Sequence, residues 1–190
     1  KVSDKIKIIE MLLVSVDKLL IGGAMAYPFL KASGYTIGNS LCTDEDVVLA
    51  RRILGTPSKG KIVLPSDHIV SATFGGTPEE VGQVNIPDGK IGLDIGPSTL
   101  QNYSDYLANA KTVLWNGPMG LFENAGFAKG TLGIAKTLST LKAFTLVGGG
   151  DSVNAVKMSG LSSKMSHIST GGGASLEYIE NGSLPGIQAL

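Results

Sequence analysis

The residues best suited to chemistry lie in glycine-rich stretches that follow short apolar runs. The apolar run 143–147 is followed by three glycines, Asp151 and Ser152, and a helix-compatible segment comes next. Glycines at a strand end let a ligand approach the backbone, and the amides that begin the following helix then face that ligand. The arrangement recurs at 22–23 and at 169–175, so we expect a phosphate or nucleotide site.

Charged residues near these glycines indicate how such a ligand would be held. A carboxylate at Asp151 would repel a bare phosphate, but it suits a site in which Mg²⁺ lies between carboxylate and phosphate oxygens. An alternative is that Asp151 only caps its helix. Lys1 and Lys5 are spaced i, i+4, so they share a helix face and could both approach phosphates. Glu123 could accept hydrogen bonds from ribose hydroxyls. The alternative for Lys1, Lys5 and Glu123 is that their side chains are simply solvated.

The common nucleotide motifs are absent from the sequence. Gly60-Lys61 and Gly89-Lys90 are each followed by isoleucine, so neither forms a Walker P-loop. Gly148-x-Gly150 begins like a dinucleotide fingerprint, but Val153 stands where the third glycine belongs. A nicotinamide oxidoreductase therefore stays an alternative without a supporting motif.

Composition narrows the class of protein further. The 190 residues are 43% hydrophobic and 17% charged, which is ordinary for a globular α/β protein. The net charge of zero argues against a broad surface that binds nucleic acid. The single cysteine, Cys42, cannot form an internal disulfide, so we expect a reducing, cytoplasmic location. No apolar run reaches about 18 residues, and we expect neither a membrane span nor a signal peptide. The chain has only two arginines, Arg51 and Arg52, which is few for a self-sufficient kinase.

Short apolar segments alternate with segments of helical spacing along the chain. The expected strands are 18–21, 61–64, 68–70, 91–95, 112–115, 143–147 and 166–168. The expected helices are 3–14, 24–33, 44–54, 98–110, 127–140, 152–158 and 174–180, and 74–90 is expected to be a surface excursion. This pattern predicts an α/β fold with a doubly wound, Rossmann-like parallel sheet and helices on both faces, in three layers. Such a sheet binds ligands at the carboxyl ends of its strands.

Six ordered motifs resemble the C-terminal, nucleotide-binding half of phosphoglycerate kinase. They are Lys1-Val2-Ser3-Asp4-Lys5, Ile21-Gly22-Gly23-Ala24-Met25-Ala26, Gly92-Leu93-Asp94-Ile95-Gly96-Pro97, Trp115-Asn116-Gly117-Pro118-Met119-Gly120-Leu121-Phe122-Glu123, Gly148-Gly149-Gly150-Asp151-Ser152 and Ser166-His167-Ile168-Ser169-Thr170-Gly171-Gly172-Gly173-Ala174-Ser175. The resemblance covers residues 1–190 as one domain. It implies that the N-terminal domain, which binds 3-phosphoglycerate through arginines, is absent, in keeping with the scarcity of arginine.

The resemblance also assigns roles to individual residues. The adenine pocket would be lined by Gly22, Gly23, Gly92 and Leu93. The ribose and phosphates would be contacted by Glu123, Lys5 and Asn116. The Mg²⁺ would be placed by Asp151, in a loop completed by Gly149, Gly150 and Ser152. Phosphoryl transfer itself would involve Lys1 and the amides of Gly171, Gly172 and Gly173.

The reaction implied by the resemblance is reversible phosphoryl transfer between MgATP and the carboxylate of 3-phosphoglycerate. We expect a monomer that binds ATP or ADP, and an isolated half that does not turn over, since the acceptor site belongs to the other domain. A non-catalytic nucleotide-binding module is the alternative.

Overall fold

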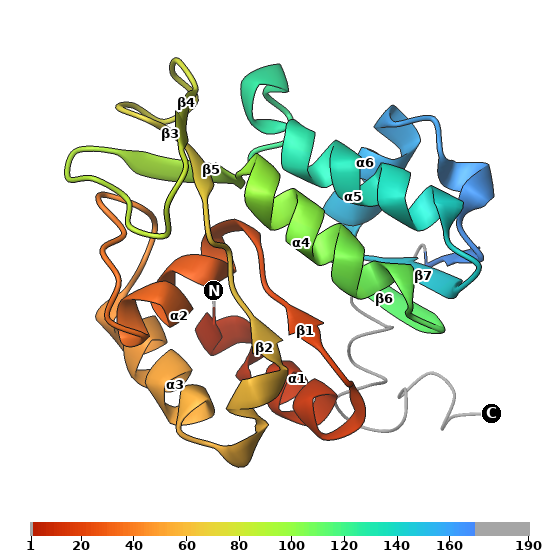
Figure 1. Cartoon of the computed structure of the whole chain (residues 1–190), viewed down its shortest axis with the longest axis horizontal. Coiled ribbons are helices and arrows are strands. Elements are labelled where there is room, and N and C mark those ends of the chain that lie inside the picture. Colours follow the sequence, from red (N-terminus) through yellow and green to blue (C-terminus); the bar gives the residue numbers. More distant parts are fainter. Residues whose placement is uncertain (1, 170–190) are drawn as a thin grey trace, which may run out of the picture.

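The computed structural model describes residues 2–169 of the chain (Figure 1). Its α-helices are α1 (Val2–Ser15), α2 (Ala26–Ala32), α3 (Asp44–Leu54), α4 (Pro97–Ala108), α5 (Lys129–Thr140) and α6 (Gly150–Met158). Its strands are β1 (Leu19–Leu20), β2 (Ile62–Val63), β3 (His68–Ser71), β4 (Glu79–Val81), β5 (Ile91–Ile95), β6 (Thr112–Asn116), β7 (Phe144–Gly148) and β8 (His167–Ile168). Short 3₁₀ turns occupy Gly23–Met25, Pro57–Lys61, Ala125–Phe127 and Ser162–Lys164. The expected helix at 174–180 lies outside the described residues.

Parallel pairing dominates, as the alternation of strands and helices predicts. β1 pairs with β2 in parallel, and β6, β7 and β8 form a second parallel sheet in that order. In this second sheet Trp115 lies opposite Val147, and Asn116 lies opposite Gly148. The ends of β6 and β7, each followed by a glycine-rich turn, therefore lie side by side.

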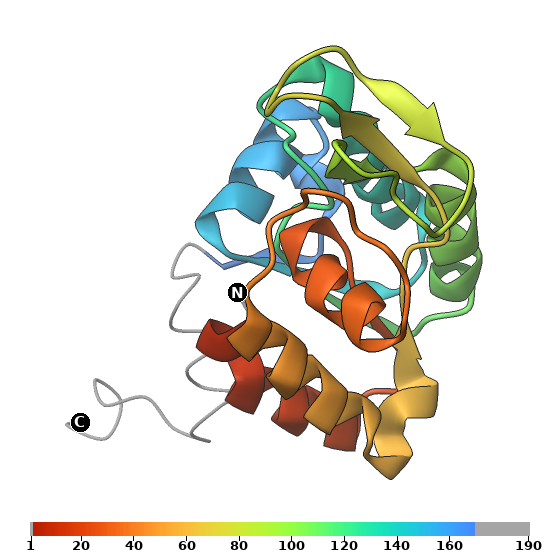
Figure 2. The ribbon, with the colours of Figure 1, turned by 90° about the vertical axis from the view of Figure 1, so that its left-hand side faces the viewer.

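Helices cover both faces of the parallel strands, which confirms the expected three-layer α/β architecture. Leu19 and Ile62 pack against a core built from α1, α2 and α3. Leu20 and Val63, the next residues along the same strands, pack against the core formed by α4, α5 and α6. Successive side chains of a strand point to opposite faces, so the two helical groups lie on opposite sides of β1 and β2. Figure 2 shows α1 and α3 side by side in the first of these layers.

The segment from 68 to 95 departs from the expected fully parallel arrangement. β3 pairs antiparallel with both β4 and β5, and β4 lies within the stretch expected to be a surface excursion. Parallel neighbours require a crossover of a dozen or more residues, usually a helix. Residues 72–90 contain no helix, so the chain returns beside β3 in the opposite direction.

Two helix starts are fixed by side-chain caps. Thr43 accepts a hydrogen bond from the Asp46 amide at 3.2 Å and caps α3, as its position before an acidic first turn predicts. α4 is capped from a distant segment: the buried Asp67 carboxylate accepts hydrogen bonds from the amides of Ser98 and Thr99 at 2.8 and 2.7 Å. These bonds hold the residue that precedes β3 to the start of α4. None of the helices in residues 2–169 has the length and apolar character needed to cross a bilayer.

Candidate functional site

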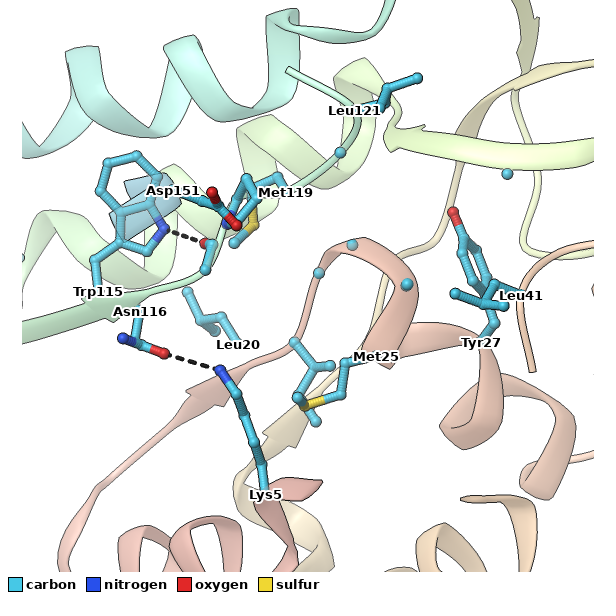
Figure 3. Close-up of a pocket in the computed structure, with 18 of the residues that line it drawn as sticks. Lys5, Leu20, Met25, Tyr27, Leu41, Trp115, Asn116, Met119, Leu121 and Asp151 are labelled. Atoms are coloured by element: carbon cyan, nitrogen blue, oxygen red, sulfur yellow. Dashed lines mark hydrogen bonds between the residues drawn. The ribbon is translucent and has the colours of Figure 1, made fainter. Parts of the chain in front are cut away.

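A cavity of about 590 Å³ opens at the carboxyl ends of β1 and β6 and beside the first residues of β5 (Figure 3). Most of the residues singled out from the sequence line it, and they come from five separate segments. They are Lys5, Gly22, Gly23, Gly92, Leu93, Asn116, Glu123 and Asp151. The structure thus brings together residues that are up to 146 positions apart, from 5 to 151.

Lys5 and Asn116 form the polar centre of this cavity. The Lys5 Nζ atom donates a hydrogen bond to Asn116 Oδ1 at 3.0 Å, which links the first turn of α1 to the end of β6 (Figure 3). This bond fixes the position of the ammonium group and leaves it further donors for a ligand, because a lysine ammonium carries three.

The turn Gly22-Gly23 lies directly against the loop that follows β6. Gly23 has φ of +63°, and its amide donates to the Met119 carbonyl at 3.0 Å. A Cβ atom on Gly22 would lie 2.5 Å from Met119 Sδ, and one on Gly23 would lie 2.8 Å from the Pro118 carbonyl oxygen. Glycine is therefore required at Gly23 by its positive φ and by the approach of the Pro118 backbone, whereas a side chain at Gly22 would have to displace the Met119 side chain. The backbone of both residues forms one wall of the cavity.

Gly92 and Leu93 form another part of the wall, from β5. The Gly92 amide donates to Ser40 Oγ at 2.9 Å, and a Cβ atom at Gly92 would lie 2.5 Å from the Tyr27 hydroxyl oxygen. The Leu93 carbonyl accepts from the Leu121 amide at 2.8 Å. Burial raises the pKa of Tyr27, with a smaller contribution from a nearby carboxylate, so Tyr27 acts here as a neutral wall residue.

The start of α6 places Asp151 in the cavity and turns its neighbours elsewhere. Gly149 precedes the helix with φ of +89°, and a Cβ atom there would lie 2.8 Å from Asn116 Nδ2. Asp151 is exposed in the first turn. Ser152 is fully buried, and its Oγ accepts from the Gly117 amide at 2.6 Å. Gly149, Gly150 and Ser152 are not among the lining residues; they shape the turn that presents Asp151.

Glu123 lies at the margin of the cavity with an exposed side chain. It belongs to the loop between β6 and α5, where the Asn124 side chain donates to the Gly75 carbonyl at 3.1 Å. An exposed carboxylate in a loop held in this way can reach a polar ligand group without a large cost in desolvation.

Several residues that organise the site were not identified from the sequence. Trp115 is buried and donates its indole N–H to the Gly117 carbonyl at 2.8 Å, and Thr131 Oγ1 accepts from the Met119 amide at 3.0 Å. Leu41 and Phe74 are largely exposed and also line the cavity. Side-chain contacts to a loop backbone depend on tertiary structure, so no spacing in the sequence points to them.

Four residues predicted to act in phosphoryl transfer lie outside the described part of the chain. They are Lys1, Gly171, Gly172 and Gly173. Their roles stay predictions.

Comparison with known proteins shows the family of the chain. The profile of the family described as phosphoglycerate kinase matches residues 1–182. The chain belongs to the phosphoglycerate kinase family. A phosphoglycerate kinase of Clostridium novyi is 53% identical over 194 residues, and one of Anaeromyxobacter sp. (strain Fw109-5) is 54% identical over 195 residues. Each alignment covers 100% of this chain and 49% of the relative.

Solved structures give the same result at the level of the fold. The phosphoglycerate kinase of Coxiella burnetii superposes with a TM-score of 0.92 at 38% identity, covering 99% of this chain and 49% of that one. The enzyme of Pyrococcus horikoshii superposes with a TM-score of 0.85 at 31% identity, again covering 49% of that chain. The chain therefore spans about half the length of the proteins it matches.

Proposed function

We propose that the chain is the nucleotide-binding half of a phosphoglycerate kinase and that it holds MgADP or MgATP in the cavity between β1, β5 and β6. The observation that supports this most directly is the convergence on one cavity of glycine-rich strand ends, an ammonium held by an amide, and a carboxylate. Together with the missing half, it would catalyse reversible phosphoryl transfer between ATP and the carboxylate of 3-phosphoglycerate.

The residues of the cavity suit phosphoryl transfer because that reaction depends on alignment and on stabilisation of negative charge. The Lys5 ammonium would hold phosphate oxygens, since its bond to Asn116 keeps it at the end of β6. The bare backbone at Gly22-Gly23 and Gly92 would accept a flat base at close range. The acceptor would come from the other half, so the two halves would have to close around both substrates.

Mg²⁺ would enter the cavity with the nucleotide. Residues 2–169 contain no group of three or more His, Cys, Asp or Glu side chains that is placed to hold a metal ion. Mg²⁺ usually keeps several waters and binds one or two carboxylates together with substrate phosphates. Asp151, exposed on the cavity wall, fits that requirement as a single protein ligand. The bound ion would neutralise phosphate charge.

Calorimetric titration of the 190-residue chain with ADP in the presence of Mg²⁺ tests the binding part of this proposal. We expect saturable binding that excess NAD does not displace. Lys5→Met should weaken it about tenfold, the equivalent of one charge-assisted hydrogen bond. Lys136→Met is the control, because Lys136 is exposed on α5 and does not line the cavity. A folded chain that binds no ADP would contradict the proposal.

Mixing experiments test the catalytic part. The chain would be combined with the half of the Clostridium novyi relative that it does not cover, and ATP consumption would be followed with 3-phosphoglycerate present or absent. We expect no turnover by either piece alone and turnover that depends on 3-phosphoglycerate in the mixture. Nucleotide binding without turnover in an associated mixture would favour a non-catalytic nucleotide-binding module.

A further inference from the structure

The hydroxyl group of Tyr27, on α2, lies at the wall of the cavity. The residue is only 4% exposed, yet within residues 2–169 its hydroxyl oxygen forms no hydrogen bond. Every side-chain nitrogen or oxygen that is sealed from solvent in that part of the chain does have a partner. The Tyr27 hydroxyl is therefore not sealed, and the space into which it opens is the cavity that the residue lines.

Packing of α2 against β5 holds this hydroxyl group in place. A Cβ atom at Gly92 would lie 2.5 Å from the hydroxyl oxygen, so the glycine in β5 makes room for it. The Tyr27 ring also lies beside the buried His68 ring, with the ring centroids 6.3 Å apart. Figure 3 shows the hydroxyl oxygen directed away from α2. Because the ring is packed by its neighbours, the hydroxyl group is presented at one fixed point of the wall.

The polar groups around Tyr27 are bonded to other partners. The His68 ring bonds the Val84 carbonyl at 3.0 Å, and the Asp94 carboxylate accepts from two backbone amides. Burial raises the pKa of Tyr27, with a smaller contribution from Asp94, so the hydroxyl group keeps its proton and can donate. In the open cavity water can accept this hydrogen bond. A ligand that displaces the water must offer an acceptor of its own, because a donor left unpaired costs free energy.

Tyr27 lies at the opposite end of the cavity from the residues proposed to hold the phosphates. Figure 3 shows Tyr27 and Leu41 together, well separated from the bonded pair Lys5 and Asn116. The wall beside Tyr27 includes the apolar Leu41 and the bare backbone of Gly92. Such a wall suits the face of a flat base, and the Tyr27 hydroxyl supplies a polar group for its edge.

We propose that the Tyr27 hydroxyl donates a hydrogen bond to a ring nitrogen of the nucleotide base and so contributes to selection of the base. This inference rests on the proposed function, since it takes the phosphates to lie at Lys5 and the base at the other end of the cavity. Adenine carries acceptor nitrogens in its ring. A site that bonds a polar group rejects an analogue without that group, because the site's own donor is then left unpaired.

Calorimetric titration of the 190-residue chain with ADP and with its 1-deaza, 3-deaza and 7-deaza analogues tests the inference. Each analogue replaces one ring nitrogen by a C–H group. We expect Tyr27→Phe to weaken ADP about fivefold, and one analogue to bind the parent chain about fivefold more weakly than ADP. In Tyr27→Phe that analogue should bind as well as ADP. Tyr27→Phe should weaken adenosine by the same factor as ADP, whereas Lys5→Met should weaken only ADP.

Tyr35→Phe is the matched control, because Tyr35 is 41% exposed and does not line the cavity. It should leave all of these affinities unchanged. Tyr27→Phe should not lower the midpoint of urea unfolding, since the Tyr27 hydroxyl has no bond to lose within residues 2–169.

The inference is overturned if every analogue binds Tyr27→Phe with the same deficit as it binds the parent chain. It is also overturned if Tyr27→Phe is destabilised as loss of an internal hydrogen bond would require. A parent chain that binds ADP and is weakened by Lys5→Met, but shows neither effect of Tyr27→Phe on the base, refutes this inference and leaves the proposed function standing. A parent chain that binds neither ADP nor adenosine refutes both.

Discussion

Lys5 and Asp151 reach the same cavity from α1 and α6, which are the first and last helices of the described chain. Their charges are opposite, yet no ion pair between them occurs within residues 2–169. Lys5 instead bonds the neutral Asn116 side chain at 3.0 Å. An ammonium and a carboxylate kept apart in one cavity are suited to bind the two kinds of charge in a metal–nucleotide complex, the phosphates and the cation.

Replacement of Asp151 by asparagine tests whether the Asp151 carboxylate holds the metal ion. If Asp151 holds Mg²⁺ beside the phosphates, Asp151→Asn should weaken MgADP by about tenfold or more while changing metal-free ADP little. Calorimetric titration with and without Mg²⁺ measures both affinities. Asp44→Asn is the control, because Asp44 is an exposed acidic residue in the first turn of α3. Equal losses for the two forms of ADP would contradict the metal-binding role. The helix-capping alternative does not hold in the structure, because Gly149 is the N-cap residue of α6 and no side chain among residues 2–169 caps that helix.

At the level of residues, the sequence predicted many of the side chains and glycines that line the cavity, but not their contacts. Asp151 and Ser152 are adjacent, and one faces the cavity while the other is buried against Gly117. That division follows from the helical rotation between neighbouring residues and from the position of the loop after β6. The orientation of the loop in turn depends on contacts such as Met119 with Thr131, which no local pattern reveals.

Tyr103 joins α4 to the ends of the parallel strands β1 and β2. It lies on α4 and is fully buried, and its hydroxyl donates towards the carbonyls of Ile21 at 2.6 Å and Val63 at 3.1 Å. Tyr103→Phe should lower the free energy of unfolding by about 1–2 kcal/mol, because the Ile21 carbonyl loses a buried partner. Tyr106→Phe, on the same helix and 42% exposed, should change it much less. Urea denaturation of both variants measures the difference; equal effects would show that the Tyr103 bond contributes nothing specific.

At the level of elements, the sequence predicted those whose signals are local. The glycine and proline after β5, the threonine before α3 and the alternating apolar runs mark boundaries that the structure matches to within a few residues. Strand direction was predicted less well for β3, β4 and β5. A helix between two strands predicts that the strands are parallel neighbours. The stretch from 72 to 90 has no helix, so its structure could be predicted only from its composition. Composition does not reveal that Glu80 pairs with Ile69.

At the scale of the whole molecule, a single carboxylate links three parts of the structure around the cavity. Asp94 of β5 is 1% exposed, and its oxygens accept hydrogen bonds from the amides of Ile95 at 2.9 Å and Gly130 at 2.8 Å. A Cβ atom on Gly120 would lie 2.5 Å from Asp94 Oδ1. Asp94 therefore holds β5, the loop after β6 and the start of α5 together. Its burial raises its pKa to about 7, and the two amide hydrogen bonds offset this only in part.

This raised pKa makes the stability of the fold depend on pH. An aspartate in the unfolded chain titrates near 3.9, so between about pH 4 and pH 7 the folded state binds more protons at Asp94 than the unfolded state does. The contribution of Asp94 is therefore fully present below about pH 4 and is lost as pH rises towards 7, by at most about 1.4 kcal/mol per pH unit. His68 acts in the opposite direction below its ordinary pKa, because burial lowers the pKa of His68 in the folded chain.

The comparison that isolates Asp94 is the difference in unfolding free energy between Asp94→Asn and the parent chain, measured by urea denaturation from pH 4 to pH 8. Asparagine cannot ionise and retains only one acceptor oxygen, so the variant should be less stable than the parent chain at pH 4. Because only the parent chain loses stability through Asp94 as pH rises, the deficit should shrink steadily up to about pH 7 and should not grow again above it. Asp88→Asn removes an exposed loop carboxylate and should run parallel to the parent chain. A deficit that stays constant across this range would show that the Asp94 carboxyl group ionises as readily in the folded protein as in the unfolded one, and that the energetic cost of its burial is met by the amides of Ile95 and Gly130.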